Sequence, residues 1–240
     1  MSLTERGEES GHGALIALKQ QLTPVVVAGD QCIEVSPVFS ELFASGGLPR
    51  GAQIRVEGTA AVTTCMSVLA RASSTGSWIA VVGMESWGWA AAVSAGIDPS
   101  RSVSVATPAP QQWSAVLAAL VDAVDIVVCD PRHQVSAADV RRLCARCRER
   151  GSIIVELTPS DGQRRSRWPN TPDIVLEAHT TGWTGIGDGF GRLTGRECVI
   201  STQGRRALAQ RRQIAVKFAE DMSVEALPNR HEVLPALQVV

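Results

Sequence analysis

The sequence has almost no lysine, no tyrosine and no long hydrophobic run. Only Lys19 and Lys217 are lysines, so arginine carries nearly all of the positive charge. The longest apolar runs, such as Ile79–Met84 and Ile126–Cys129, have the length of a strand and are far shorter than the roughly 20 residues of a membrane-spanning helix. Met1–Gly13 is acidic and lacks the apolar core of a signal peptide. We therefore expect a cytoplasmic protein that does not bind membranes.

The sequence contains cysteine, but not in a pattern typical of a disulfide-stabilised fold or a metal site. A chain of 240 residues, 45% of them hydrophobic, can bury a large core without disulfides. We therefore expect the six cysteines to be reduced thiols. Cys144 and Cys147 form a single C-x-x-C pair inside an expected helix, with no second pair at zinc-site spacing, and the four histidines are scattered. We expect no metal site.

The basic residues are unevenly distributed along the chain. Residues 132–217 contain 16 Lys and Arg against 8 Asp and Glu, whereas residues 1–131 contain 6 against 12. An arginine-rich segment contacts phosphate, an acidic protein surface or only solvent. Charge alone leaves these three alternatives open.

Short apolar runs alternate with helical segments through the middle of the chain. The expected strands are Gln53–Glu57, Trp78–Val82, Val103–Ala106, Ile126–Cys129 and Ile153–Leu157. The expected helices are Thr63–Ser73, Gly88–Ala95, Pro110–Ala123 and Ala137–Arg150, the last with Ser136 as N-cap and Gly151 as its stop. This alternation is typical of βαβ units. It predicts an α/β fold with a mainly parallel sheet that helices flank.

The flanks of this core follow other patterns. We expect residues 1–13 to be disordered, and residues 14–43 to form a helix (Ala14–Leu22), two short strands (Val25–Ala28 and Cys32–Val35) and a helical turn (Pro37–Phe43). Towards the C-terminus, Ile174–His179, Gly191–Leu193 and Glu197–Thr202 are expected to extend the sheet as antiparallel strands. The predicted units are residues 1–45, a core of residues 46–202, and a tail of residues 203–240.

One stretch is specific enough to indicate a family. Gly46-Gly47-Leu48-Pro49, a turn, and a strand ending at Gly58 resemble the segment that leads into the phosphate-binding loop of RecA-family recombinases. Glu85 follows the second core strand, where RecA has its water-activating glutamate, and Asp130 ends the strand that matches Walker B. The resemblance covers roughly residues 14–202 and implies a RecA-like core of the P-loop NTPase type.

The phosphate loop itself is degenerate. A working loop reads G-x-x-x-x-G-K-[ST], in which lysine neutralises phosphate and the hydroxyl binds Mg²⁺. In that register Gly58 survives, Thr63 replaces the second glycine, Thr64 replaces lysine and Cys65 replaces the hydroxyl residue. No other register supplies a lysine, because the chain has none between Lys19 and Lys217. We expect no bound nucleotide cofactor and no enzymatic activity.

A RecA-like core with an eroded loop in a short chain resembles the actinobacterial ImuA′ family. The stretches that carry this resemblance are Gly47–Gly51, Trp78–Gly83, Gly88–Gly96, Val124–Asp130, Ala137–Gly151 and Gly182–Gly187 leading into Gly191–Leu193. The resemblance implies a non-enzymatic adaptor of the DNA-damage-induced mutasome. Such a protein acts in mutagenic translesion synthesis with an ImuB-like partner, which is an inactive Y-family polymerase homologue, and indirectly with an error-prone DNA polymerase. RecA and single-stranded DNA are further candidate partners, at the nucleoid after DNA damage.

Two basic segments are candidate contact sites. Arg164, Arg165 and Arg167 beside Trp168 suit phosphate contact and base stacking on single-stranded DNA, and a solvated loop is the alternative. In the tail, Ala207–Ala219 is amphipathic if it is helical, and we expect it either to dock the partner or to fold back on its own sheet. The residues that would dock are Leu208, Arg211, Arg212, Ile214, Lys217 and Phe218. Two other functions therefore stay open: an ATP-binding recombination accessory and a DNA-binding regulator.

Overall fold

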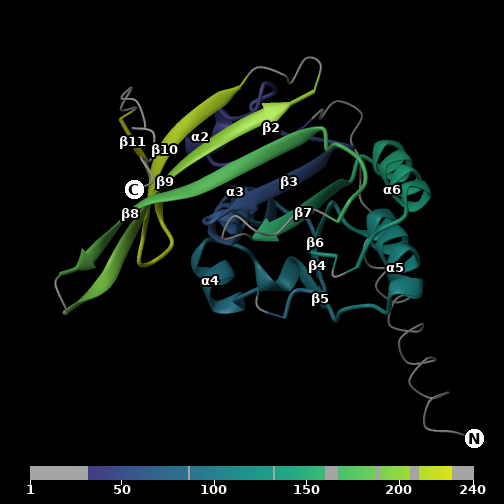
Figure 1. The fold of residues 1–240 in the computed structure, drawn as a ribbon, viewed down its shortest axis with the longest axis horizontal. Helices are drawn as coiled ribbons and strands as arrows, with labels where there is room; N and C mark the ends of the chain where they lie inside the picture. Colours follow the sequence, from purple (N-terminus) through teal and green to yellow (C-terminus); the bar gives the residue numbers. More distant parts are fainter. Residues whose placement is uncertain are drawn as a thin grey trace, which may run out of the picture.

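The computed structural model describes residues 32–85, 87–131, 133–159, 167–187, 190–205 and 211–228. A nine-stranded sheet in the order β11-β10-β9-β8-β3-β7-β6-β4-β5 forms its centre (Figure 1). The expected elements within residues 1–28 lie outside the described residues. The chain folds as a mixed α/β protein with a mainly parallel central sheet, flanking helices and antiparallel C-terminal strands, as the sequence predicts.

The parallel half of the sheet contains β3 (Gln53–Gly58), β4 (Ile79–Val82), β5 (Ser102–Val105), β6 (Ile126–Cys129) and β7 (Ile153–Pro159). β4 and β6 are continuous apolar runs and are buried along their whole length, as is typical of parallel strands with both faces covered. β5, at the edge of the sheet, is only partly buried. The parallel half therefore brings the carboxyl ends of these strands to one edge.

The helices divide between the two faces. Side chains of α3 (Ala61–Ser74) and α4 (Trp89–Ser94) belong to one core cluster with the sheet. Side chains of α5 (Pro110–Ala123) and α6 (Ala137–Arg150) belong to a second cluster, and a 3-10 turn (Pro99–Arg101) precedes β5. The bounds of α5 and α6 are those that the sequence predicts. Ser136 Oγ caps α6 by accepting a hydrogen bond from the Asp139 N–H at 3.1 Å.

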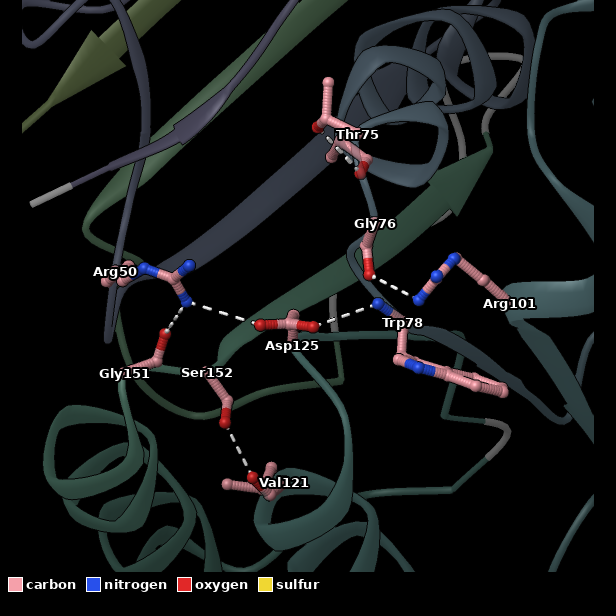
Figure 2. A network of polar contacts seen from close by, with 10 residues as sticks. Arg50, Thr75, Gly76, Trp78, Arg101, Val121, Asp125, Gly151 and Ser152 are labelled. Atoms are coloured by element: carbon pink, nitrogen blue, oxygen red, sulfur yellow. Dashed lines mark hydrogen bonds and ion pairs between the residues drawn. The ribbon is translucent and has the colours of Figure 1, made fainter. Parts of the chain in front are cut away.

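The amino edge of the parallel strands is tied together by one carboxylate. Asp125, just before β6, accepts a hydrogen bond from the Trp78 backbone N–H at 2.9 Å and from Arg50 Nη1 at 3.4 Å (Figure 2). Arg50 Nη1 also donates to the carbonyl oxygen of Gly151 at 3.4 Å. These bonds fix the starts of β4, β6 and β7 relative to the turn before β3.

The C-terminal strands extend the sheet beyond the predicted core. They are β8 (Ile174–Ile186), β9 (Gly191–Gly204), β10 (Arg212–Ala219) and β11 (Val224–Leu227). β8 runs parallel to β3, and each later strand is antiparallel to the one before it. Residues 212–219 therefore form a strand and not a helix, and the segment adds to its own sheet, which is the second of the two expected alternatives. The boundary expected after residue 202 falls inside β9. The ends of β8 and β9 project from the body as a hairpin (Figure 1).

A small unit precedes the main sheet. β1 (Cys32–Glu34) pairs antiparallel with β2 (Gly47–Pro49), and α2 (Pro37–Ser40) lies between them in the chain. The sequence alone predicts a turn over Gly47–Gly51, but Gly47–Pro49 forms a strand because Cys32–Glu34 supplies a partner. The boundary expected after residue 45 therefore separates the two strands of one sheet. Among the described residues, no helix is long and apolar enough to cross a membrane.

Candidate functional site

The turn between β3 and α3 is too short to surround a phosphate. The motif places four residues, Thr59–Val62, between its first glycine and position 63. In the structure α3 begins at Ala61, so only Thr59 and Ala60 separate the strand from the helix. A phosphate loop binds through backbone N–H groups that face inward from an open loop. Two residues do not form such a loop, so the backbone here cannot wrap a triphosphate.

The surviving glycine has a structural role of its own. Gly58 has φ of +104°, and a Cβ added there would lie 2.2 Å from the carbonyl oxygen of Ala178 in β8. The same carbonyl accepts a hydrogen bond from the Ala60 N–H at 3.0 Å. Only glycine tolerates both this backbone conformation and this approach. The contact with β8 therefore accounts for Gly58 without any nucleotide.

The residues at the lysine and hydroxyl positions face the protein interior. Thr64 and Cys65 are buried, and Thr64 Oγ1 has no hydrogen-bond partner among the described residues. Burial raises the pKa of the Cys65 thiol to about 12, so the thiol stays neutral. A neutral, buried thiol is a poor ligand for Mg²⁺, which prefers oxygen. Thr63 alone of the three is partly exposed.

An arginine from β9 occupies the space beside the first turn of α3. Arg196 donates from Nη1 to Thr63 Oγ1 at 3.2 Å, from Nε to Thr180 Oγ1 at 2.8 Å, and from Nη2 to the carbonyl oxygen of Thr59. Its guanidinium carbon lies 4.8 Å from the ring centre of Trp183. A shallow pocket of about 490 Å³ opens here, lined by Thr59, Thr180, Thr181, Gly182, Trp183 and Arg196. The position therefore holds a cation that is already bonded to the protein.

Glu85 and Asp130 follow neighbouring strands, as the sequence predicts. β4 and β6 pair with Val82 opposite Cys129, so both carboxylates come after strand ends at the same edge. Glu85 is exposed and Asp130 is half-buried. Sequence analysis did not identify Glu156, a buried carboxylate on β7, which lies between β6 and β3 in the sheet. Glu156 pairs with Arg55 of β3 at 2.9 Å.

The predicted DNA-contacting segment is only partly described. Arg164 and Arg165 lie outside the described residues, and Arg167 is half-buried. Trp168 is 5% exposed and packs edge-to-face on Trp113, with 5.5 Å between ring centres. The predicted stacking of bases on Trp168 is therefore wrong, because the ring belongs to the core beneath α5 and α6.

The predicted docking residues of the tail fall on the two faces of β10. Ile214 and Phe218 are buried in the core, so they are not available to a partner. Arg211 is exposed, Arg212 and Lys217 are partly exposed, and Arg212 Nη1 donates to the carbonyl oxygen of Glu41 at 3.1 Å. Leu208 lies outside the described residues. The apolar half of the predicted docking surface is therefore wrong.

A different apolar surface lies at the end of the β8–β9 hairpin. We call residues 183–187 and 190–193 the hairpin tip. Its large exposed side chains are Trp183, Ile186, Phe190 and Leu193, and Phe190 is 77% exposed. Gly185 has φ of +91°, and a Cβ there would lie 2.0 Å from the Arg192 carbonyl oxygen, which explains one of the glycines. The glycines of residues 185–191 predict a β turn from the sequence alone, but they do not predict that the hairpin projects from the body (Figure 1).

The buried C-x-x-C pair behaves as ordinary core. Cys144 and Cys147 are both buried on α6, and burial raises the pKa of Cys147 to about 12. Within the part of the chain that the structure describes, no three His, Cys, Asp or Glu residues gather as a metal site would require.

A model of a known protein family matches about half of the chain. The family model described as MT3502 N-terminal domain matches residues 41–166, from the loop before β2 to the segment that follows β7. The match therefore spans the parallel core and both helical faces, and it ends before the hairpin. No curated protein matches the sequence. The chain belongs to the MT3502 N-terminal domain family.

Proposed function

We propose that the protein is a non-enzymatic RecA-like adaptor in DNA-damage-induced mutagenic translesion synthesis. It docks an ImuB-like partner, an inactive Y-family polymerase homologue, and through it an error-prone DNA polymerase. It acts in the cytoplasm and joins the nucleoid after DNA damage. The observation that carries the non-enzymatic part is the closed phosphate position: a two-residue turn, with Arg196 bonded to Thr59 and Thr63.

The chemistry supports an inactive site. Phosphoryl transfer depends on a metal ion and on cations that neutralise the charge developing on the phosphate oxygens. Here Thr64 and Cys65 are buried and present neither a cation nor a metal ligand. Glu85 remains exposed at the sheet edge, but it has no positioned phosphate on which to act. RecA forms its filaments on nucleotide, so we also propose that this chain forms no ATP-dependent filaments.

The hairpin tip supports docking. Exposed apolar patches on soluble proteins mark interaction surfaces, and Trp, Phe and Ile supply large contact area. The tip is held on paired strands, because β8 and β9 remain paired as far as Ile186 and Gly191, with a register shift at each of two irregularities. A surface that is already ordered loses little conformational entropy on binding. We therefore assign docking to the hairpin tip instead of the tail.

The experiment compares partner binding by matched variants. Phe190→Ser with Ile186→Thr removes apolar surface from the tip without touching the core. Val93→Thr, on α4, removes another exposed apolar side chain and serves as the control. We expect the tip variant to bind the ImuB-like partner at least tenfold more weakly, and the control to bind within twofold of the wild type. Equal binding by all three proteins would remove the tip from the proposal.

The other two functions receive unequal support. A cation beside the N-terminus of α3 is the one feature that favours an ATP-binding accessory, because helix N-termini and arginine both attract phosphate. ATP hydrolysis that Arg196→Met abolishes would establish that function. The DNA-binding regulator loses its stacking residue, since Trp168 is buried.

A further inference from the structure

A second pocket, of about 780 Å³, opens at the opposite end of β3 from Gly58. It lies where β3 and β8 begin, beside α6. Four arginines from separate parts of the chain line it: Arg50 from the turn before β3, Arg141 and Arg148 from α6, and Arg205 from the end of β9. The lining includes a single carboxylate, that of Asp173. The proposed function does not use this pocket.

The arginines of α6 divide into two sets. Arg142 pairs with Asp139 at 3.3 Å, and Arg146 and Arg150 both pair with Asp122. Arg141 and Arg148, the two that line the pocket, make no ion pair with any described residue. They are seven residues apart and therefore share one face of the helix. The other three arginines of α6 thus share two carboxylates, whereas the two arginines at the pocket have none among the described residues.

The floor of the pocket is polar and incompletely bonded. Gln53 is 3% exposed, and its Oε1 accepts from Asn170 Nδ2 at 2.7 Å and from Cys144 Sγ at 3.3 Å. Gln53 Nε2, Asn170 Oδ1 and Arg50 Nε are buried without a partner among the described residues. Buried polar groups in native proteins are normally hydrogen-bonded. Three such atoms around one cavity point to a ligand that completes them.

The hydrogen bonds at the amino edge of the parallel strands fix the position of the Arg50 side chain beside the pocket. Its Nη1 is engaged with Asp125 and the Gly151 carbonyl oxygen, which leaves Nε unbonded (Figure 2). Asp125 offsets the charge of Arg50, and Asp173 offsets one of the other three arginines. The lining therefore carries an excess of about two positive charges, counted from formal charges.

We infer that this pocket binds a compact oxyanion of charge about −2, a phosphate monoester or a dicarboxylate. Guanidinium groups bind both anions through paired N–H donors. Gln53 Nε2 and Arg50 Nε donate to the anion, and Asn170 Oδ1 accepts from a hydroxyl group of the ligand. The volume is that of a small-molecule site. A nucleic-acid backbone would contact the exposed arginines at the rim, Arg141 and Arg148, but would not reach the polar floor at Gln53.

Calorimetry with three probes tests the inference: glycerol 3-phosphate, malate and single-stranded oligothymidylate. The two small probes each carry about two negative charges and a hydroxyl group. The test variant is Arg141→Gln with Arg148→Gln, and the matched control is Arg142→Gln on the same helix. Asn170→Ala tests the floor. We expect saturable binding of glycerol 3-phosphate, malate or both at one site. The double variant should raise the dissociation constant at least tenfold and Asn170→Ala at least threefold, while Arg142→Gln stays within twofold of the wild type.

The other outcomes overturn the inference. If neither small anion binds, or if the double variant and the control lose affinity equally, the pocket is not an oxyanion site. If only oligothymidylate binds and the double variant alone weakens it, the arginines contact nucleic acid at the rim. Circular dichroism of each variant, matched to the wild type, assigns a lost signal to binding and not to unfolding.

Discussion

Arg196 reaches from β9 to Thr63 in the first turn of α3, with 3.2 Å between Nη1 and Oγ1. The two residues are 133 positions apart in the chain. Arg196 also bonds to the Thr59 carbonyl oxygen, so it joins the C-terminal strands to the turn where a phosphate loop would open. In a chain whose loop lysine is missing, the bonds of Arg196 fix the turn in its short form.

The first prediction concerns ATP hydrolysis. We expect no turnover above that of a buffer control, and no difference between the wild type and Glu85→Gln, because no residue at the loop positions holds the metal or the γ-phosphate. A coupled assay with purified protein measures this. Turnover that Glu85→Gln removes would show a working catalytic glutamate.

The second prediction concerns the stability that Arg196 contributes. Arg196→Met removes hydrogen bonds to three threonines and leaves Thr63 Oγ1 and the Thr59 carbonyl oxygen without this donor, whereas Thr180 Oγ1 still accepts from Thr59 Oγ1. We expect a loss of about 1–3 kcal/mol in the free energy of unfolding, measured by urea denaturation. Arg192→Gln is the control, because Arg192 forms an exposed pair with Glu220 and should cost about 1 kcal/mol or less. Equal losses would indicate that the contacts of Arg196 do not hold the turn.

The third prediction separates burial from DNA binding at Trp168. Because the ring fills the core against Trp113, Trp168→Ala should lower the free energy of unfolding by about 3–5 kcal/mol. Replacing Arg164, Arg165 and Arg167 with alanine should leave stability nearly unchanged. If these arginines contact three phosphates, that variant should lower the log–log salt slope of single-stranded DNA binding by about 2. A stable Trp168→Ala protein would contradict the burial of the ring.

The fourth prediction concerns pH. Burial raises the pKa values of Cys65 and Cys147 to about 12, well above the ordinary value of a cysteine thiol. In the unfolded chain these thiols ionise near their usual pKa, whereas the folded protein keeps them neutral. Their contribution to stability is therefore complete below about pH 9 and is lost as the pH rises towards 12. Denaturation at pH 7, 9 and 10 should show a decline in the free energy of unfolding, and Cys65→Ala should make that decline shallower.

Thiol reactivity gives a further prediction. In the native protein at pH 8, the half-buried Cys32 should react with a thiol reagent before the five buried cysteines.

The helices were predictable because their signals are local. The apolar period of Pro110–Ala123, and the cap and stop around α6, depend on neighbouring residues alone, so the bounds agree with the structure. The strand in the tail was not predicted, for an identifiable reason. Ile214 and Phe218 are four residues apart, a spacing that a helix and a strand both satisfy. Val216 between them completes the two-residue period of β10.

The closed site was only half predictable. The sequence alone shows that lysine and the hydroxyl residue are missing. That Arg196 would lie beside Thr63, and that Trp168 would lie against Trp113, depends on contacts between distant segments. The four arginines of the second pocket come from three distant segments in the same way. The composition shows that the chain is rich in arginine, but it does not show that these four arginines line one pocket.

The most direct test of the proposed function is the affinity between this protein and its ImuB-like partner, measured by interferometry with and without ATP and Mg²⁺. A nucleotide-independent adaptor predicts one dissociation constant under both conditions, raised at least tenfold by Phe190→Ser with Ile186→Thr. Absence of binding, or binding that appears only with ATP, would contradict the proposal.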